Sequence, residues 1–202
     1  MFSITLNEEF MAKLAFVNTL APTRDIRYFL NNVHFIISGD TVEIDATDGY
    51  ILAHSEIKMD VNVDAKIEFC VDVSIIKEFL ANAKKVKRSL SLNKMLIDEK
   101  GNGKFVSKDD NEYVFENKNC SYPDIHSVLN RVDVKGECCP MSLSIVYFKR
   151  MCDAWNQAMN QVVRKKFDSC MVKAETDVSK KNLKYTYEGD ELRNTVVLIS
   201  AK

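Results

Sequence analysis

Arg24-Asp25-Ile26-Arg27-Tyr28-Phe29-Leu30-Asn31 is followed, fifteen residues after it ends, by Ala46-Thr47-Asp48-Gly49-Tyr50-Ile51-Leu52-Ala53-His54. Between these blocks, residues 33–37 and 41–44 alternate apolar and polar side chains, and Ser38-Gly39-Asp40 is typical of a turn. The pattern predicts one hairpin between the blocks. We therefore expect Arg27, Leu30 and the Thr47-Asp48-Gly49 turn at the same end of a sheet, beside apolar side chains.

The chain around this hairpin repeats one order of elements. A strand at 2–6 precedes a helix that begins after Asn7 and ends before Pro22, because Asn is a good N-cap and Pro cannot continue a helix. A second helix follows Asp72 or Ser74. Hydrophobic periodicity predicts the remaining elements of two β-α-β-β-β halves as strands at 28–37, 41–47, 50–59, 66–71, 89–92, 95–98 and 112–116, with a turn at 101–103.

A third half is predicted after a linker at 125–137. It comprises a strand at 139–143, a long helix capped by Ser144, and strands near 167–174, 182–188 and 194–199. The apolar stripe of the long helix is expected to pack in the core, and it consists of Phe148, Met151, Cys152, Trp155 and Met159. The fold class is therefore α+β, with helices on one face of curved antiparallel sheets.

Composition points to an ordinary soluble globular protein. Of the 202 residues, 46% are hydrophobic and 28% are charged. No apolar run is long enough for a membrane span, and no signal peptide is evident, so a cytoplasmic protein without a membrane partner is expected. The six cysteines include no CxxC pair, which favours free thiols over disulfides or a zinc site.

The sequence offers little for catalysis. His34, His54 and His126 are scattered along the chain, and none lies at metal-ligand spacing from a cysteine or carboxylate. Asp48-Gly49 after a strand is first of all a turn signal. We therefore expect no enzyme, no catalytic residue, no metal and no cofactor.

Charge leaves two interpretations open. The formal net charge is −1, which argues against a wholly basic nucleic-acid binder. Basic clusters nevertheless occur at 84–88 and 164–166, each at the end of a predicted helix. Such clusters are either solvated helix ends that complement the helix dipole or part of a DNA-facing surface.

The two opening blocks resemble the middle domain of bacterial DNA sliding clamps, the beta subunit of DNA polymerase III. That domain carries D-[VI]-R-Y-[YF]-L-N and then A-T-D-G-H-R-L-A at nearly this spacing. A third motif, F-P-D-Y-x-x-V-L, is matched by Ser121-Tyr122-Pro123-Asp124 with Val128-Leu129. The resemblance covers about the first 130 residues well and the rest loosely. It implies a DNA-clamp fold with a complete domain at 1–124, a linker at 125–137 and a partial domain at 138–202.

The resemblance also implies a hydrophobic groove for short peptides of polymerases and other clients. Thr195-Val196-Val197-Leu198 is aligned with the family's Y-V-V-M near its C-terminus. The family's His-Arg is Tyr-Ile here, which should make the groove more apolar. The groove residues carried over are Arg27, Leu30, Thr47, Gly49, Tyr50, Ile51, Leu52, Val196 and Leu198.

DNA contact is carried over in the same way to the block that begins at Arg24. Arg24 is the first candidate for a phosphate contact, because such contacts are independent of sequence, as a sliding ring requires. The further candidates are Tyr28, Phe29, Lys13, Lys84 and Lys85.

The resemblance thus implies a non-enzymatic processivity factor in DNA replication that binds double-stranded DNA and tethers a polymerase. A clamp protomer has six helices and two protomers line the hole with twelve, whereas this chain supplies three, so a ring needs a homo-oligomer. One alternative is a reduced relative that keeps the peptide groove and competes for clients without encircling DNA. The other is an unrelated enzyme on the same scaffold, because fold does not fix function.

Overall fold

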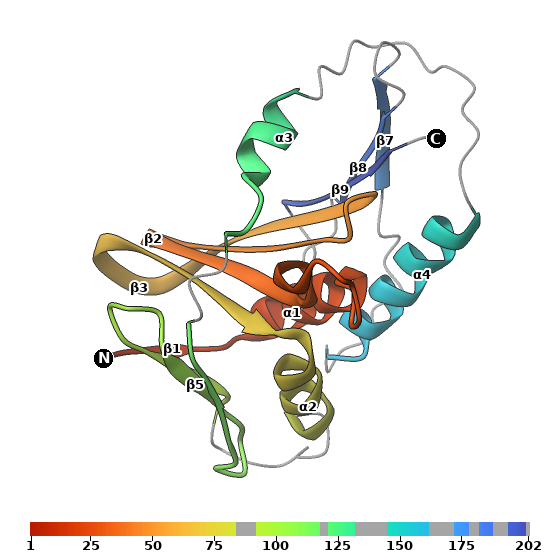
Figure 1. Cartoon of the computed structure of the whole chain (residues 1–202). Helices are drawn as coiled ribbons and strands as arrows, with labels where there is room; N and C mark the ends of the chain where they lie inside the picture. Colours follow the sequence, from red (N-terminus) through yellow and green to blue (C-terminus); the bar gives the residue numbers. More distant parts are fainter. Residues whose placement is uncertain are drawn as a thin grey trace.

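The computed structural model describes residues 1–83, 92–117, 121–131, 145–161, 172–177, 182–187 and 194–200. Its elements, in chain order, are β1 (Phe2–Thr5), α1 (Glu8–Leu20), a 3-10 helix η1 (Tyr28–Asn31), β2 (Asn32–Thr47), β3 (Ile51–Asp72), α2 (Val73–Ala83), β4 (Lys94–Ile97), β5 (Gly103–Val106), β6 (Glu112–Phe115), α3 (Ile125–Arg131), α4 (Ile145–Met159), β7 (Val172–Asp177), β8 (Asn182–Tyr187) and β9 (Thr195–Ser200) (Figure 1). The predicted strand at 139–143 and residues 89–91 of another lie outside the described residues.

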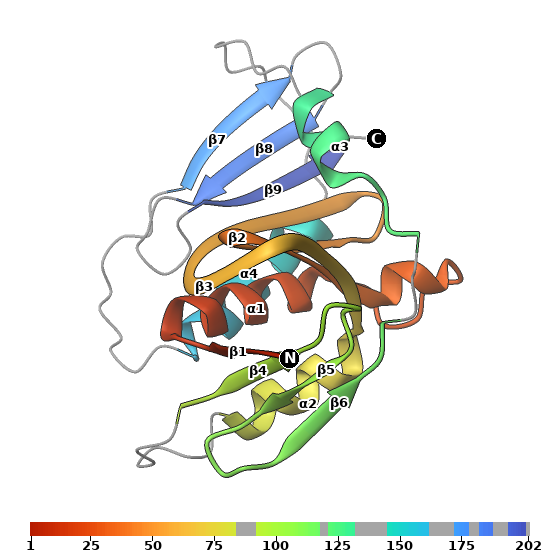
Figure 2. The ribbon, with the colours of Figure 1, turned by 90° about the vertical axis from the view of Figure 1, so that its left-hand side faces the viewer.

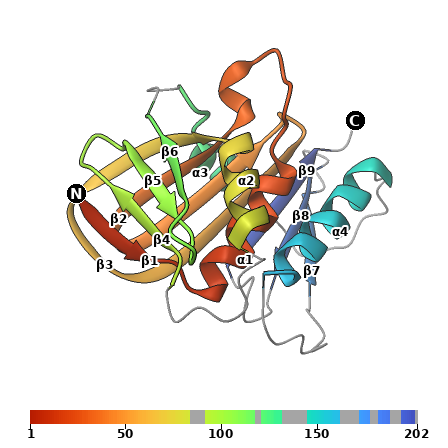
Figure 3. The same cartoon turned by 90° about the horizontal axis from the view of Figure 1, so that it is seen from below.

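Two antiparallel sheets and their helices form the described structure, which confirms the predicted α+β class. One sheet has the order β1-β4-β5-β6, and the other has the order β2-β3-β9-β8-β7 (Figure 2). Helix α1 packs against both α4 and α2, and the three helices can be followed together in Figure 3. In the described part of the chain, no helix is both long and apolar enough to cross a membrane.

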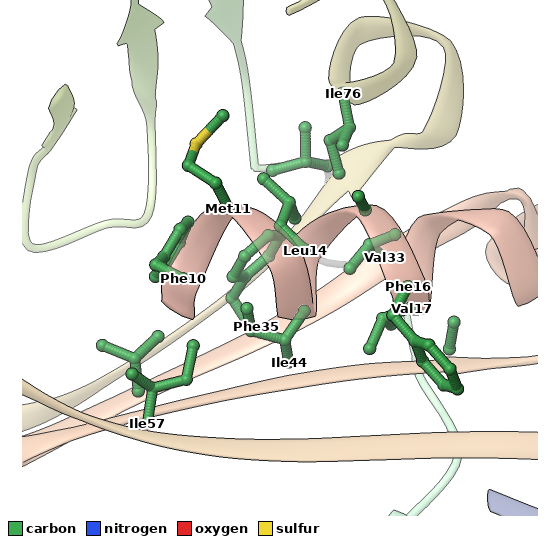
Figure 4. Packing of buried hydrophobic residues seen from close by; sticks show 14 of the residues in the cluster. Phe10, Met11, Leu14, Phe16, Val17, Val33, Phe35, Ile44, Ile57 and Ile76 are labelled. Carbon is green, nitrogen blue, oxygen red and sulfur yellow. The ribbon is translucent and has the colours of Figure 1, made fainter. Parts of the chain in front are cut away.

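Helix α1 lies at the centre of the core. Its N-terminus is capped by Asn7, whose Oδ1 accepts a hydrogen bond from the Phe10 backbone N–H at 2.8 Å, and it ends at Leu20 before Pro22. The helix is buried almost all round, because β2 and β3 cover one side while α2 and α4 cover others. Figure 4 shows its side chains between the sheet and α2: Phe10, Met11, Leu14, Phe16 and Val17, against Val33, Phe35, Ile44, Ile57 and Ile76.

The predicted hairpin between the two blocks is confirmed. Ser38-Gly39-Asp40 lies inside β2, whose register against β3 shifts on both sides of Gly39. The chain reverses there, because Arg27 before β2 donates to Asp48 O after it and His34 contacts Asp45. A second turn connects Thr47 to Ile51, and the strands predicted at 50–59 and 66–71 are one strand, β3. Its two ends pair with the two arms of the hairpin, 52–58 with 41–47 and 67–72 with 32–37. Residues 28–31, predicted as strand, form η1 instead.

The C-terminal strands extend the sheet of the N-terminal part. Strand β9 pairs antiparallel with β3 from Ile51↔Ile199 to Ser55↔Thr195, and β8 and β7 follow outward. Two elements were not predicted: α3 begins within the expected linker, and β5 follows the turn at 101–103. That turn is confirmed by a hydrogen bond from Gly101 N to Asp98 O at 3.1 Å.

The predicted stripe on α4 is only partly buried. Met151 lies in the core, whereas Phe148 is 46% exposed and Cys152 is exposed. Ala154 and Ala158 are fully buried in their place. Because α4 packs on α1 rather than directly on a sheet, small side chains at the contact let the two helices approach closely.

Candidate functional site

The turn between β2 and β3 is held by its own polar groups. Thr47 Oγ1 accepts a hydrogen bond from Gly49 N at 3.0 Å and donates one to Ile51 O at 2.8 Å. Asp48 Oδ1 accepts from the backbone N–H groups of Tyr50 and Ile51, each at 2.9 Å. Gly49 has φ +88°, a left-handed conformation that glycine adopts without steric cost. The turn is therefore a fixed backbone edge.

Arg27 joins the first sequence block to this turn. Its Nε and Nη2 donate to the two carboxylate oxygens of Asp25 at 2.9 and 2.8 Å, and Nη2 also donates to Asp48 O at 2.8 Å. The side-chain hydrogen bond from Arg27 lowers the pKa of Asp25 to about 2. The two blocks thus lie at the same end of the sheet, as their pattern predicted.

A small group of apolar side chains lies next to the turn, separate from the main core. Leu52 of β3 and Leu198 of β9 are register partners, and Ile125 at the start of α3 packs on both. Thr47 N donates to the Tyr122 hydroxyl at 3.1 Å, which ties the segment before α3 to the turn. We call this group the apolar cluster; it comprises Leu52, Ile125 and Leu198, with Tyr122, Leu129 and Val196 partly buried around them.

The structure divides the predicted groove residues. Leu52, Val196 and Leu198 lie in the apolar cluster, while Arg27, Thr47 and Gly49 form the adjoining edge. Ile51 instead points into the main core, because successive side chains of a strand face opposite sides. Leu30 is buried in η1 but is not part of the cluster, and Tyr50 is 47% exposed.

Helix α4 holds the same turn from another side. Arg150 forms an ion pair with Asp48 through Nη1, and its Nη2 donates to Leu20 O at 2.5 Å. The Tyr147 ring lies 6.0 Å from the Arg150 guanidinium and 6.4 Å from the Tyr50 ring. No local signal in the sequence relates Arg150 to residue 48.

The residues proposed to contact DNA differ in how exposed they are. Arg24 is exposed, Tyr28 is 76% exposed, and the Tyr28 and Phe29 rings meet edge to face at 6.0 Å. Lys13 is fully buried, and its ammonium donates to Glu9 at 2.5 Å and to Glu56 O at 2.9 Å. It therefore cannot reach a phosphate from this position. Lys84 and Lys85 lie outside the described residues.

All three histidines gather on the face of the β2–β3 hairpin that is opposite to the core. Asp45 accepts contacts from His54 Nδ1 at 2.7 Å and from His34 Nδ1 at 3.3 Å. His34 Nε2 lies 3.1 Å from Glu68, and His126 Nε2 lies 2.7 Å from Glu43. The His34 ring stacks on Tyr122 at 4.7 Å. We call these six charged or titratable residues the histidine cluster: His34, His54, His126, Glu43, Asp45 and Glu68.

The expectation that the histidines are scattered was therefore wrong. His34 and Asp45 are eleven residues apart in one strand, which would separate them by about 36 Å if the strand were straight. They meet because the chain reverses within β2, where its register against β3 shifts around Gly39. Burial disfavours the charged form of His54, but the hydrogen bond and charge of Asp45 outweigh it and raise the pKa of His54.

Comparison with known proteins gives likeness in structure alone. No protein-family model matches the sequence, and no curated protein matches it. Among solved structures, the DNA polymerase sliding clamp from Bacillus subtilis has a TM-score of 0.74 and 14% identity, over 100% of this chain and 64% of that one. The sliding clamp from Pseudomonas aeruginosa has a TM-score of 0.74 and 13% identity, over 100% and 66%. The DNA polymerase III beta subunit from Thermotoga maritima has a TM-score of 0.67 and 9% identity, over 98% and 64%.

Proposed function

We propose that this chain, which has the fold of bacterial DNA sliding clamps, is a clamp-type processivity protein that captures client proteins by a short peptide at the apolar cluster. The chain spans 64–66% of the length of the three solved clamps named above. The proposal therefore concerns the peptide site first and DNA second. It includes no catalytic step.

The observation that carries this proposal is the meeting of β3, β9 and α3 beside one fixed turn. Leu52, Leu198 and Ile125 come from segments far apart in the sequence, yet they form one apolar surface against the 47–51 turn. Such a surface suits an extended peptide, whose Leu and Phe side chains enter apolar contacts while backbone groups meet the turn. Partly buried Val196 and Leu129, with Val128 39% exposed, offer the contact area.

A peptide titration tests this assignment. A fluorescein-labelled peptide with a Leu-Phe anchor should bind with micromolar affinity, measured by fluorescence polarisation. Val196→Lys and Leu129→Lys should each weaken binding by about 2 kcal/mol or more, as for an anchor contact. Both side chains are only partly buried, so these variants are expected to fold. Val114→Lys, at a 63% exposed valine of the other sheet, is the matched control.

Equal affinity in all three lysine variants would exclude the apolar cluster as the peptide site. Leu52→Lys is a further test, but Leu52 is only 6% exposed, so its fold must be checked by circular dichroism. Leu30→Lys tests the remaining leucine assigned by resemblance.

The DNA part of the proposal requires more than one copy of the chain around a duplex. Open sheet edges favour such assembly, because unpaired edge strands readily pair with another chain. Among the described strands, β1, β6 and β7 lie at the ends of their sheets. Analytical ultracentrifugation should show a dimer or tetramer, and a strict monomer would exclude a ring.

A second candidate is a peptide-binding protein that does not encircle DNA. The observation that favours it is the mixed charge on the exposed helix faces: Lys77 and Lys149 are accompanied by Glu78 and Asp153. Duplex binding measured across a range of salt separates the two. A DNA-holding protein should show a log–log slope that falls in magnitude by about 0.9 for Arg24→Ala, whereas the second candidate shows no binding to weaken.

A further inference from the structure

We propose that Glu43, Asp45, His54 and His126 bind a divalent transition-metal ion of the Zn²⁺ class, and that this ion fastens α3 to the β2–β3 hairpin. The site lies beside the apolar cluster and is distinct from it. Its existence does not depend on the proposed function, whereas its effect on peptide binding does.

The topology of the hairpin brings three of these ligands together. Glu43 and Asp45 are two residues apart on β2 and so share a face, and His54 is the register partner of Asp45 on β3. One ligand atom from each of Glu43, Asp45 and His54 lies within 4.8 Å of the others. Because Ile44 between them points into the core, this face is turned away from α1.

His126 supplies the fourth ligand from α3. Its Nε2 lies 2.7 Å from Glu43, and its ring lies 5.6 Å from the ring of His54. The four proposed ligands differ in the exposed fraction of their side chains. It is 0% for Asp45, 11% for His54, 19% for Glu43 and 53% for His126. An ion can therefore reach the buried ligands from the side of α3.

The donor set fits zinc. Two imidazole nitrogens and two carboxylate oxygens are ligands that Zn²⁺ binds in a tetrahedral arrangement. His54 Nδ1 and His126 Nε2 each lie in hydrogen-bond contact with a carboxylate oxygen, and the ion would take the place of the hydrogen between them. The second carboxylate oxygen of Asp45 contacts His34 Nδ1. The other ring nitrogen of His34 contacts Glu68, and the His34 ring stacks on Tyr122. Such supporting contacts orient metal ligands and strengthen binding.

A metal here would act on the wall of the apolar cluster. His126 follows Ile125, which packs on Leu52 and Leu198, and Leu129 lies one helical turn further along α3. Fixing His126 to β2 and β3 therefore fixes the helix that carries these two apolar side chains. If the apolar cluster binds peptide, the metal should raise peptide affinity by holding this wall in place.

Cobalt substitution tests the site on the whole chain. Co²⁺ bound by nitrogen and oxygen gives weak visible d–d bands without the strong near-ultraviolet thiolate band, which separates this site from the cysteines. The wild type should show this spectrum, and Zn²⁺ should displace the Co²⁺. His126→Ala and Glu43→Gln should each weaken Co²⁺ binding by about tenfold or more. Both side chains are partly exposed, so neither variant should disturb the fold.

Glu78→Gln is the matched control, because Glu78 is an exposed carboxylate of α2 and is not a proposed ligand. Equal Co²⁺ affinity in Glu43→Gln and Glu78→Gln would overturn the assignment, as would a thiolate spectrum or the absence of binding at millimolar Co²⁺. Zn²⁺ at a hundredfold excess over its Kd should also raise the Tm of the wild type by about 5 to 10 °C.

Peptide titrations with and without Zn²⁺ test the coupling separately. Zn²⁺ should strengthen peptide binding in the wild type and not in His126→Ala. If Co²⁺ binds as expected and no peptide binds under either condition, the proposed function fails while the metal site stands. If peptide binds equally with and without Zn²⁺, the coupling is overturned.

Discussion

Arg27 packs so closely on Gly49 that a Cβ atom at Gly49 would lie 2.7 Å from Arg27 Nη1. Real Cβ atoms essentially never come this near a neighbour, so the absence of a side chain at Gly49 leaves the space that the Arg27 guanidinium occupies. This contact joins two blocks of sequence that are separated by the whole of β2. It fixes the turn that borders the apolar cluster.

Replacing Gly49 should therefore destabilise the protein. Gly49→Ala combines a left-handed φ with displacement of the Arg27 guanidinium from its hydrogen bond to Asp48 O, and we expect it to lower the free energy of unfolding by about 1 to 3 kcal/mol. Urea unfolding measures the change. Gly39→Ala is the control, because Gly39 also has positive φ but has nothing within 4 Å of its Cβ position. A larger loss for Gly39→Ala than for Gly49→Ala would contradict this contact.

The Asp25–Arg27 pair predicts a local pH dependence. Arg27 lowers the pKa of Asp25 from 3.8 to about 2. Because the pKa is lowered in the folded state, the contact stabilises above pH 3.8 and loses its effect as pH falls toward 2. Carboxyl carbon NMR should show Asp25 ionised well below pH 3.8, and Arg27→Ala should raise its midpoint. An unchanged midpoint in Arg27→Ala would mean that the pair does not form.

Two buried hydroxyls predict how firmly β9 is joined to β3. Ser55 Oγ and Thr195 Oγ1 lie 2.8 Å apart, and neither residue is exposed. Thr195→Val should cost about 1 to 3 kcal/mol of stability, because it leaves a buried hydroxyl without this partner. The double variant Ser55→Ala, Thr195→Val should cost less than Thr195→Val alone. Additive losses in urea unfolding would show that the hydroxyls do not interact.

Arg150 predicts the strength of the contact between α4 and the turn. Arg150→Ala removes the ion pair with Asp48 and the hydrogen bond to Leu20 O, and should cost about 1 to 2 kcal/mol after allowance for partial exposure. Lys149→Ala, at the exposed neighbouring position, should change stability by less than about 0.5 kcal/mol. Thermal unfolding of both variants measures the difference, and equal Tm values would argue against the Arg150 contact.

Much of the fold could be predicted from local patterns. Asn7 and Pro22 bracket α1 because capping and termination depend on a few neighbouring residues. The turn signal at Ser38-Gly39-Asp40 likewise marks a reversal of the chain, since it brings His34 to Asp45. The local pattern did not show that residues 51–72 form one strand, β3, that pairs with both arms of this hairpin.

Only the parts of the site that belong to the family-like sequence motifs could be predicted. The two blocks and the Tyr122-Pro123-Asp124 segment led to the turn and to one wall of the apolar cluster. The histidine cluster and Arg150 were missed because their partners come from pairing between strands and from helix packing. Neither leaves a signal at a fixed spacing in the sequence.

Methyl NMR on the peptide complex tests the central claim most directly, because it reports where a peptide binds as well as whether it binds. With a Leu-Phe peptide at saturation, we expect shifts at the methyl groups of Leu52, Leu129 and Leu198, and none at Leu14 or Leu80 in the main core. Peptide-induced shifts that leave Leu52, Leu129 and Leu198 unchanged would contradict a client site at the apolar cluster.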